Sequence, residues 1–216
     1  KGLGNACANR VKVIPPGIEN TWFEVERNQV VPTHLLFWGR IEEEKGLPEL
    51  LVALNTVAKK FANIKLTLVG EGNRLQEYKT LVADLGLTDC VEFTGWLNSR
   101  EIETLAAKSS IGIFPSRIES FGLSVVEAMA TGLPVIAASG GAVPENIEDG
   151  VTGTLVPVNN SDALAGAINR ALENPKPSEM MAKAAKSAVQ QKFSWDRAAD
   201  SMIEVYKNIR MKTPSI

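Results

Sequence analysis

The sequence predicts an α/β protein built on a parallel, doubly wound β-sheet, and three observations support this prediction. Short apolar runs alternate with amphipathic segments over most of the 216 residues. Runs such as Leu35–Trp38 are apolar at successive positions, which suits strands buried on both faces of a sheet. The links between segments are short, as they are when each strand is followed by a helix that returns the chain to the same edge. Together these features indicate a Rossmann-like fold.

Six apolar runs are expected to form the strands. They span Thr33–Gly39, Ile64–Gly70, Cys90–Phe93, Ile111–Phe114, Val135–Ala138 and Thr154–Val156. The expected helices span Leu47–Phe61, Leu75–Leu85, Ser99–Ala107, Leu123–Ala130, Ser161–Leu172, Glu179–Lys192 and Trp195–Ile209. In the first of these helices, apolar residues recur at a spacing that places them on one face. Pro175 and Pro177 are expected to separate the last two helices from the preceding one.

Composition and charge exclude several classes of protein. The chain is 44% hydrophobic and 22% charged, which is typical of soluble proteins, and its length allows a sizeable core. A net charge of -2 gives no reason to expect nucleic acid as a partner. No apolar run approaches the roughly 20 residues that a membrane-spanning helix needs. The two cysteines, Cys7 and Cys90, lack metal or redox spacing, which favours reduced thiols in a cytoplasmic protein.

The stretch Phe114–Ile136 is the most informative about function. It is expected to run strand, loop, helix, turn and strand, with Glu119 on the loop and Glu127 eight residues later in the helix. The amino end of the helix between them presents free backbone N–H groups and the positive end of a dipole, which suits a phosphate. A phosphate site flanked by two carboxylates that can accept hydrogen bonds from hydroxyl groups indicates a nucleotide-sugar ligand.

The pattern P-S-x-x-E-x-F-G-L-x-x-x-E-A-M-A-x-G-x-P-V in this stretch resembles the signature of the retaining glycosyltransferases of family 4, which have the GT-B fold. Two glutamates eight residues apart would mean little alone, but six further motifs occur in the family's order over nearly the whole chain. These are G-R-x-x-x-x-K-G at Gly39–Gly46, V-G-E-G at Val69–Gly72, V-x-F-T-G-W at Val91–Trp96, G-G-x-x-P-E at Gly140–Glu145, D-G-x-T-G-x-L-V at Asp149–Val156 and F-S-W at Phe193–Trp195.

The resemblance implies that this chain is the C-terminal, donor-binding half of a two-domain hexosyltransferase. Val13–Glu19 resembles the segment that opens this half in the family, with Pro16 where asparagine is usual. An N-terminal acceptor-binding domain is therefore expected outside the chain, with peripheral membrane association through that domain. Residues 1–20 are expected to be a linker, residues 21–192 the nucleotide-sugar-binding domain, and residues 193–216 a crossover helix and a frayed tail. A UDP-hexose is the favoured donor and a GDP-hexose the main competitor.

Arg40 and Lys45 directly follow the first strand, at the sheet edge where open α/β sheets bind ligands. Cations there would stabilise the negative charge that develops on a departing nucleoside diphosphate. The resemblance makes Arg40, Lys45 and Glu119 the catalytic residues, whereas taken alone the two cations could belong to a solvated loop neutralised by residues 42–44. Lys45 is expected to be an exposed loop residue. Because no D-x-D motif is present to hold a metal on the pyrophosphate, we expect no metal and no other cofactor.

By the same resemblance, Glu127 binds the ribose and Glu119 binds hydroxyl groups of the transferred sugar. The backbone N–H groups of Phe121, Gly122 and Leu123 would contact the phosphate and the sugar. Ser120 stands where the family has glycine, and the added Cβ restricts the loop.

The remaining donor-binding residues are expected at the ends of two other strands. Gly39 belongs to the motif after the first strand, and Trp96 and Leu97 follow the third strand, where the family holds the base. An alternative interpretation makes Trp96 a core aromatic. His34, the only histidine, is expected to be a packed or edge residue of a strand and not a ligand.

A dinucleotide cofactor and a P-loop nucleotide are excluded because the chain lacks their motifs. Two alternative functions stay open. Leu75 stands where a dinucleotide fingerprint requires its third glycine, and the chain contains no G-x-x-x-x-G-K-[ST]. The first alternative function is a nucleotide-sugar-binding module without turnover. The second is a sugar-nucleotide epimerase of the GT-B type.

Overall fold

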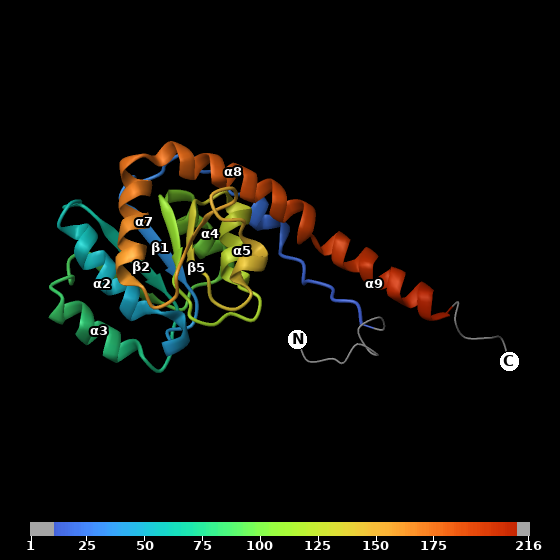
Figure 1. The fold of residues 1–216 in the computed structure, drawn as a ribbon, viewed down its shortest axis with the longest axis horizontal. Helices are drawn as coiled ribbons and strands as arrows, with labels where there is room; N and C mark the ends of the chain where they lie inside the picture. The colour runs from blue at the N-terminus through green and yellow to red at the C-terminus, as the bar shows by residue number, and fades with distance from the viewer. Residues whose placement is uncertain (1–10, 211–216) are drawn as a thin grey trace.

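The computed structural model describes residues 11–210, and within them a single parallel sheet forms the centre of the fold (Figure 1). The six strands lie in the order β3-β2-β1-β4-β5-β6, and all neighbouring pairs are parallel. The strands are β1 (His34–Trp38), β2 (Lys65–Val69), β3 (Val91–Gly95), β4 (Ile111–Phe114), β5 (Val135–Ala138) and β6 (Thr154–Val156). The predicted α/β fold with a doubly wound parallel sheet is confirmed.

Helices follow most of the strands. Those of the described chain are the short 3-10 helices η1 (Asn20–Glu24) and η2 (Glu43–Lys45), and α2 (Leu47–Ala58), α3 (Leu75–Asp84), α4 (Ser99–Lys108), α5 (Leu123–Thr131), α6 (Val143–Asn146), α7 (Ser161–Glu173), α8 (Pro175–Lys192) and α9 (Trp195–Arg210). None of them combines the length and apolar character that crossing a membrane requires.

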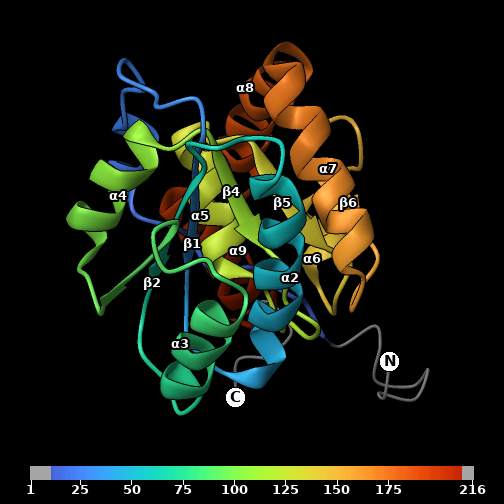
Figure 2. The same ribbon diagram turned by 90° about the vertical axis from the view of Figure 1, so that its left-hand side faces the viewer.

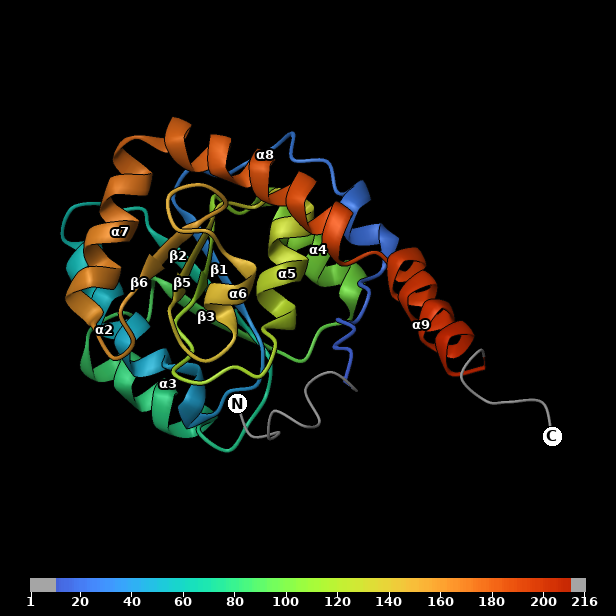
Figure 3. The ribbon, with the colours of Figure 1, turned by 45° about the vertical axis from the view of Figure 1, so that its right-hand side comes forward.

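The helices form two layers around the sheet. Helices α2, α3 and α7 cover one face, and α4 and α5 cover the other (Figures 1 and 2). Helix α8 packs against α7 on one side and against α5 on the other, crossing the edge of the sheet where the strands begin (Figure 3). The opposite edge, where the strands end, is left to loops. The successive apolar residues of Leu35–Trp38 are buried on both faces of the sheet, as their pattern predicts.

Two helix boundaries illustrate how local chemistry sets the elements. Asn160 begins α7, because its side-chain oxygen accepts a hydrogen bond from Ala163 N at 2.8 Å. Helix α8 begins at Pro175, although the sequence placed its start near Glu179. Prolines are tolerated there because the first N–H groups of a helix have no acceptor within it. The short elements η1, η2 and α6 were not predicted.

The last helix leaves the body of the molecule (Figures 1 and 3). Phe193 is buried and packs edge-on against Phe121 at 5.4 Å, which anchors the start of α9 to the loop after β4. Ile18 N donates to Phe193 O at 2.9 Å, and Lys12 pairs with Glu204 further along α9. Residues 1–10 and 211–216, with Cys7, lie outside the described residues, and so do parts of the expected linker and tail.

Candidate functional site

Strands β1 and β4 are neighbours in the sheet, and the connections that follow them run to opposite faces. The chain passes from β1 into α2 on one face of the sheet and from β4 into α5 on the other, so the direction of the strand order switches between these two strand ends, and we call this switch point the crevice. Open α/β sheets bind ligands at such points. The predicted residues Gly39–Lys45 and Glu119–Leu123 belong to the two connections that border this crevice.

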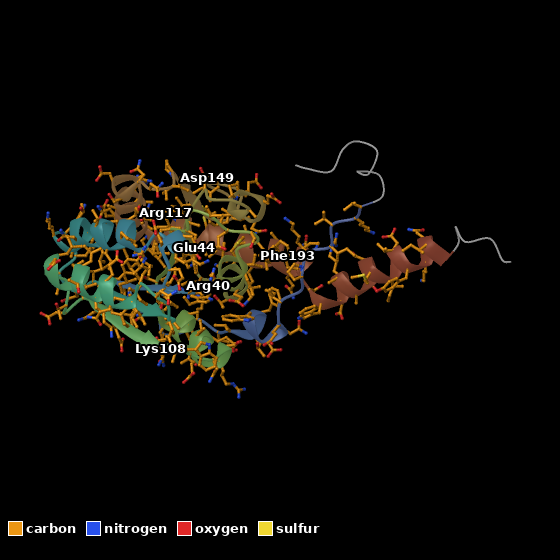
Figure 4. The ribbon with its side chains drawn as sticks, turned by 90° about the horizontal axis from the view of Figure 1, so that it is seen from below. Arg40, Glu44, Lys108, Arg117, Asp149 and Phe193 are labelled. Carbon is orange, nitrogen blue, oxygen red and sulfur yellow. The ribbon has the colours of Figure 1, made fainter. Side chains whose placement is uncertain are left out.

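The two connections are fastened to each other. Arg117 N donates to Glu44 O at 2.7 Å, and the Arg117 guanidinium donates to Glu49 Oε1 in the first turn of α2 at 2.6 Å. A Cβ on Gly46 would lie 2.2 Å from Pro115 O, so only glycine allows this approach. Figure 4, which views the molecule from the side of the strand ends, shows Arg40, Glu44 and Arg117 gathered near its middle. The connections after β1 and β4, which carry the predicted site residues, are therefore held together by direct contacts.

Lys45 and Glu119 form an ion pair between the two connections. Lys45 Nζ lies 2.5 Å from Glu119 Oε1, and Ser116 Oγ donates to the same oxygen at 2.9 Å. Only 13% of the Lys45 side chain and 12% of the Glu119 side chain are exposed. The expectation of an exposed Lys45 was wrong, because its partner lies on the neighbouring loop and covers it.

Arg40 differs from Lys45 in its surroundings. Its side chain is 72% exposed and pairs with Glu44 at 2.8 Å. In this arrangement Arg40 is neutralised within its own loop, as the alternative interpretation expected, and it is free to reorient because an exposed pair of this kind is weak. A role for Arg40 at the phosphate stays a prediction.

The start of α5 is open toward the crevice. Gly122 adopts a left-handed backbone with φ 81°, and no side chain caps the helix. The first N–H groups of α5 therefore keep their positive dipole end available for an anion. Asn146 of α6 donates to Phe121 O, and Ala142 N donates to Glu119 O at 2.8 Å, so α6 supports the loop from behind.

The Gly140–Gly141 pair explains a motif that was recognised only by resemblance. A Cβ on Gly140 would lie 2.4 Å from Ser116 O, and a Cβ on Gly141 would lie 2.1 Å from Glu119 O. Both glycines thus allow the chain after β5 to contact the backbone of the Glu119 loop. Gly140, Gly141 and Asn146 were not among the predicted site residues, although the motif pointed to this segment.

Glu127 is half-buried and is hydrogen-bonded to an aromatic side chain of β1. Trp38 Nε1 donates to Glu127 Oε2 at 2.9 Å, and the Trp38 ring stacks on Trp22 and packs edge-on against Phe114. Burial raises the pKa of the Glu127 carboxyl to about 7, the Trp38 hydrogen bond opposes this rise, and the charges of Glu19 and Glu103 add to it. Whether Glu127 contacts a ribose stays a prediction.

The remaining predicted residues lie on the same edge at other strands. Gly39 N donates to Val69 O at 3.0 Å, which joins the ends of β1 and β2. Trp96 follows β3, two strands from β1, and is 70% exposed, so the alternative interpretation as a core aromatic was wrong. Leu97 packs against the core. The structure does not bring Trp96 and Leu97 into contact with the Lys45–Glu119 pair.

The structure also bears on metal binding and on His34. Among residues 11–210, no group of three or more histidine, cysteine, aspartate or glutamate side chains is placed to hold a metal ion. His34 is half-buried and its Nε2 lies 2.8 Å from Thr67 Oγ1, which confirms the prediction of a packed strand residue.

The chain is similar to known glycosyltransferases over most of its length. The family model for glycosyl transferases group 1 matches residues 19–188. An uncharacterized glycosyltransferase of Methanocaldococcus jannaschii is 31% identical over 94% of this chain and 55% of its own length. A D-inositol 3-phosphate glycosyltransferase of Acidothermus cellulolyticus is 31% identical over 95% of this chain and 50% of its own length. The chain spans about half the length of these relatives.

Two solved structures show the same architecture. Anabaena Alr3699/HepE in complex with UDP-glucose superposes with a TM-score of 0.82 at 26% identity, covering 93% of this chain and 58% of that one. The C-terminal domain of a glycosyl transferase group 1 family protein (LpcC) from Francisella tularensis superposes with a TM-score of 0.70 at 27% identity, covering 84% of this chain and 96% of that one. On the family match and these similarities, the chain belongs to the glycosyl transferases group 1 family.

Proposed function

We propose that this chain is the donor-binding, C-terminal half of a retaining GT-B hexosyltransferase of family 4, and that its donor is a nucleotide-sugar, with a UDP-hexose favoured. Two comparisons support this. The Anabaena relative was solved with UDP-glucose, and the F. tularensis relative, matched over 96% of its length, is described as a C-terminal domain. Activity of the whole protein then requires an acceptor-binding half that these 216 residues do not include.

The observation that supports this function best is the Lys45–Glu119 pair at the crevice between β1 and β4. When the bond between the sugar's anomeric carbon and the phosphate oxygen breaks, negative charge accumulates on the departing nucleoside diphosphate. The Lys45 ammonium and the open amino end of α5 can both stabilise that charge. Arg40 would turn from Glu44 to the phosphates, because a bidentate phosphate contact is stronger than an exposed ion pair.

In this proposal the transferred sugar lies on the side of Glu119. Once a phosphate binds Lys45, the Glu119 carboxylate can accept hydrogen bonds from hydroxyl groups of the transferred sugar. Backbone N–H groups of Phe121, Gly122 and Leu123 lie on the same loop and would contact the phosphate and the sugar. Glu127 would bind the ribose through the oxygen that Trp38 does not occupy, and Trp96 and Leu97 would hold the base.

We further propose that transfer is metal-independent and that the protein is cytoplasmic, with membrane association through the acceptor half. Lys45, Arg40 and the α5 amides supply the positive charge that a divalent ion would otherwise provide. Two alternative functions retain the proposed donor site. The isolated chain can bind a donor without turnover, and a sugar-nucleotide epimerase would use a similar donor site. A product assay on the full-length protein, with an excess of chelator, distinguishes transfer from isomerisation and tests the need for metal.

A binding screen tests the proposal on the chain itself. The unfolding of residues 1–216 is followed with UDP, GDP, ADP and their hexose derivatives. A specific nucleotide at about 100 times its dissociation constant should stabilise the fold by about 2.7 kcal/mol. Lys45→Ala should weaken that nucleotide roughly tenfold or more, on the scale of charge-assisted hydrogen bonds.

Lys60→Ala is the matched control. Lys60 also forms an ion pair, with Glu173, but the pair joins the turn after α2 to the end of α7, away from the crevice. This variant should bind nucleotide as the wild type does. The proposed function fails if no nucleotide or sugar nucleotide binds, or if Lys45→Ala and Lys60→Ala have equal effects on affinity.

A further inference from the structure

A cavity lies at the edge of the sheet where the strands begin, opposite the proposed donor site. It has a volume of about 570 Å³, within the range of small-molecule sites. Its walls come from the segment between η1 and β1, the turn after α5, the end of α7 and the part of α8 from Pro175 to Lys186. Figure 3 shows α8 and the segment before β1 running together along this edge. The cavity shares no lining residue with the Lys45–Glu119 site.

Two cationic side chains converge in this cavity. A Cβ on Gly132 would lie 3.6 Å from Lys186 Cδ and 3.9 Å from Arg27 Cδ, so both stems cross the same glycine. Lys183, one turn before Lys186 on α8, adds a third positive charge to the wall, and Glu179 supplies one negative charge. Arg27 is held in place by donating to Ala106 O and, at 2.8 Å, to Ser109 O.

None of these three cations has an ion pair in the described part of the chain. Burial lowers the pKa of Arg27 to about 10 against the opposing charge of Glu179. Burial and the charge of Arg27 both lower the pKa of Lys186. Three cations share one carboxylate here, and a bound anion would relieve both their mutual repulsion and the desolvation of Arg27 and Lys186.

The rest of the cavity wall is mostly apolar. Ile111 and Pro134 are buried at the starts of β4 and β5, and Leu172 and Val25 close the sides. A sugar would leave many hydroxyl groups without partners on such a surface, whereas a hydrocarbon or aromatic group would lose little by leaving water. The occupant that fits both halves of the cavity is an anion with an apolar body.

We propose that the cavity between α5, α7 and α8 binds a small amphiphilic anion, with a carboxylate or phosphate head on Lys186 and Arg27 and an apolar body on Ile111, Pro134 and Leu172. The site is separate from the donor crevice and does not depend on the proposed transferase activity. Helix α5 links the two, since its first residues border the crevice and its last residues border the cavity.

The test uses probes that share an eight-carbon chain and differ in the head group. Octanoate, octyl phosphate, octanol and octylammonium are titrated into the isotope-labelled chain, and amide shifts are followed by NMR. Octanoate or octyl phosphate should shift amides around Gly132 and along the first half of α8, and the two titrations show which head group is preferred. Octanol should bind more weakly and octylammonium should not bind at the cavity.

Lys186→Met keeps most of the length of the side chain and removes its charge. It should weaken the anionic probes roughly fivefold to tenfold. Lys59→Met, at the end of α2 and outside the cavity, should leave their affinity unchanged. Equal binding of octanoate and octanol would show a merely apolar groove and overturn the proposal. Shifts confined to other parts of the molecule, or an equal effect of the two variants, would overturn it as well.

Discussion

Lys45 and Glu119 belong to the proposed site, and they also have a structural role because they form a largely buried ion pair. An exposed Lys45, as the sequence predicted, could be changed to alanine with little effect on the unliganded fold, but the structure predicts otherwise. With Lys45 gone, the largely buried Glu119 carboxylate keeps, among residues 11–210, Ser116 as its side-chain hydrogen-bond partner. We expect the free energy of unfolding to fall by about 1–3 kcal/mol, measured by urea denaturation.

Two further variants test whether the Lys45–Glu119 pair causes this loss of stability. Lys60→Ala breaks a pair whose side chains are 57% and 45% exposed, and should cost at most about 1 kcal/mol. Adding Glu119→Gln to Lys45→Ala removes the unpaired charge and should recover part of the loss. If Lys45→Ala costs no more than Lys60→Ala, the pair does not stabilise the fold.

Glu127 should make stability depend on pH. Its pKa is about 7 in the folded chain against 4.5 for the free side chain, so the folded state holds the proton more tightly. The stabilisation is complete below pH 4.5 and is lost as the pH rises through 7. Glu127→Gln cannot ionise. Its stability relative to wild type should therefore increase between about pH 5 and about pH 8, by on the order of 3 kcal/mol.

Urea denaturation of both proteins at the two pH values measures this difference, and a difference that does not change with pH contradicts the prediction. Trp38→Phe supplies an independent check, because it keeps the ring between Trp22 and Phe114 but removes the N–H that lowers the Glu127 pKa. Carboxyl NMR of this variant should show a Glu127 pKa higher than in wild type.

At the scale of elements, glycines fix how closely the site's loops approach each other. Gly70 has φ +135°, and a Cβ there would lie 1.9 Å from Gly39 O. Gly86 also has a positive φ, +69°, but has nothing within 4 Å of its Cβ position. Gly86→Ala should cost about 1 kcal/mol of backbone strain. Gly70→Ala should cost clearly more and should also weaken nucleotide binding, because it displaces the connection after β1.

Unfolding and nucleotide titrations on both variants decide this point. Equal stability losses, or an unchanged nucleotide affinity in Gly70→Ala, would show that the contact between Gly39 and Gly70 does not shape the site.

The elements also show what the sequence could and could not predict. Strands β4, β5 and β6 match their predicted bounds. β4 and β5 are buried along their whole length, and each of the three short runs is bounded by serine, proline or glycine, which marks its ends in the sequence. Burial of Lys45 and support of the Glu119 loop by Gly141 and Asn146 could not be derived from local pattern. Both depend on contacts between loops that are distant in the sequence. The exposure of Trp96 likewise depends on its place at the edge strand β3.

At the scale of the whole molecule, α9 leaves apolar side chains uncovered. Met202, Ile203 and Tyr206 are 42%, 48% and 64% exposed on a helix that extends from the body. We expect the proposed acceptor-binding half to cover them. Changing Ile203 and Tyr206 together to glutamate should then alter the stability of residues 1–216 by no more than about 0.5 kcal/mol. The same change should destabilise the full-length protein.

Thermal or urea denaturation of the two proteins with and without the substitutions measures both effects. A loss of stability confined to the isolated chain, with none in the full-length protein, would argue that α9 packs within this domain instead.

Our main proposal places the nucleotide where β1 and β4 end. The most direct test is an NMR titration of the isotope-labelled chain with UDP, followed residue by residue. We expect UDP to shift the amide signals of Gly39–Gly46 and of Ser116–Leu123. We expect no shifts around Arg27 and Lys186 at the opposite edge of the sheet. Shifts at the opposite edge alone, or no shifts at millimolar UDP and GDP, would contradict it.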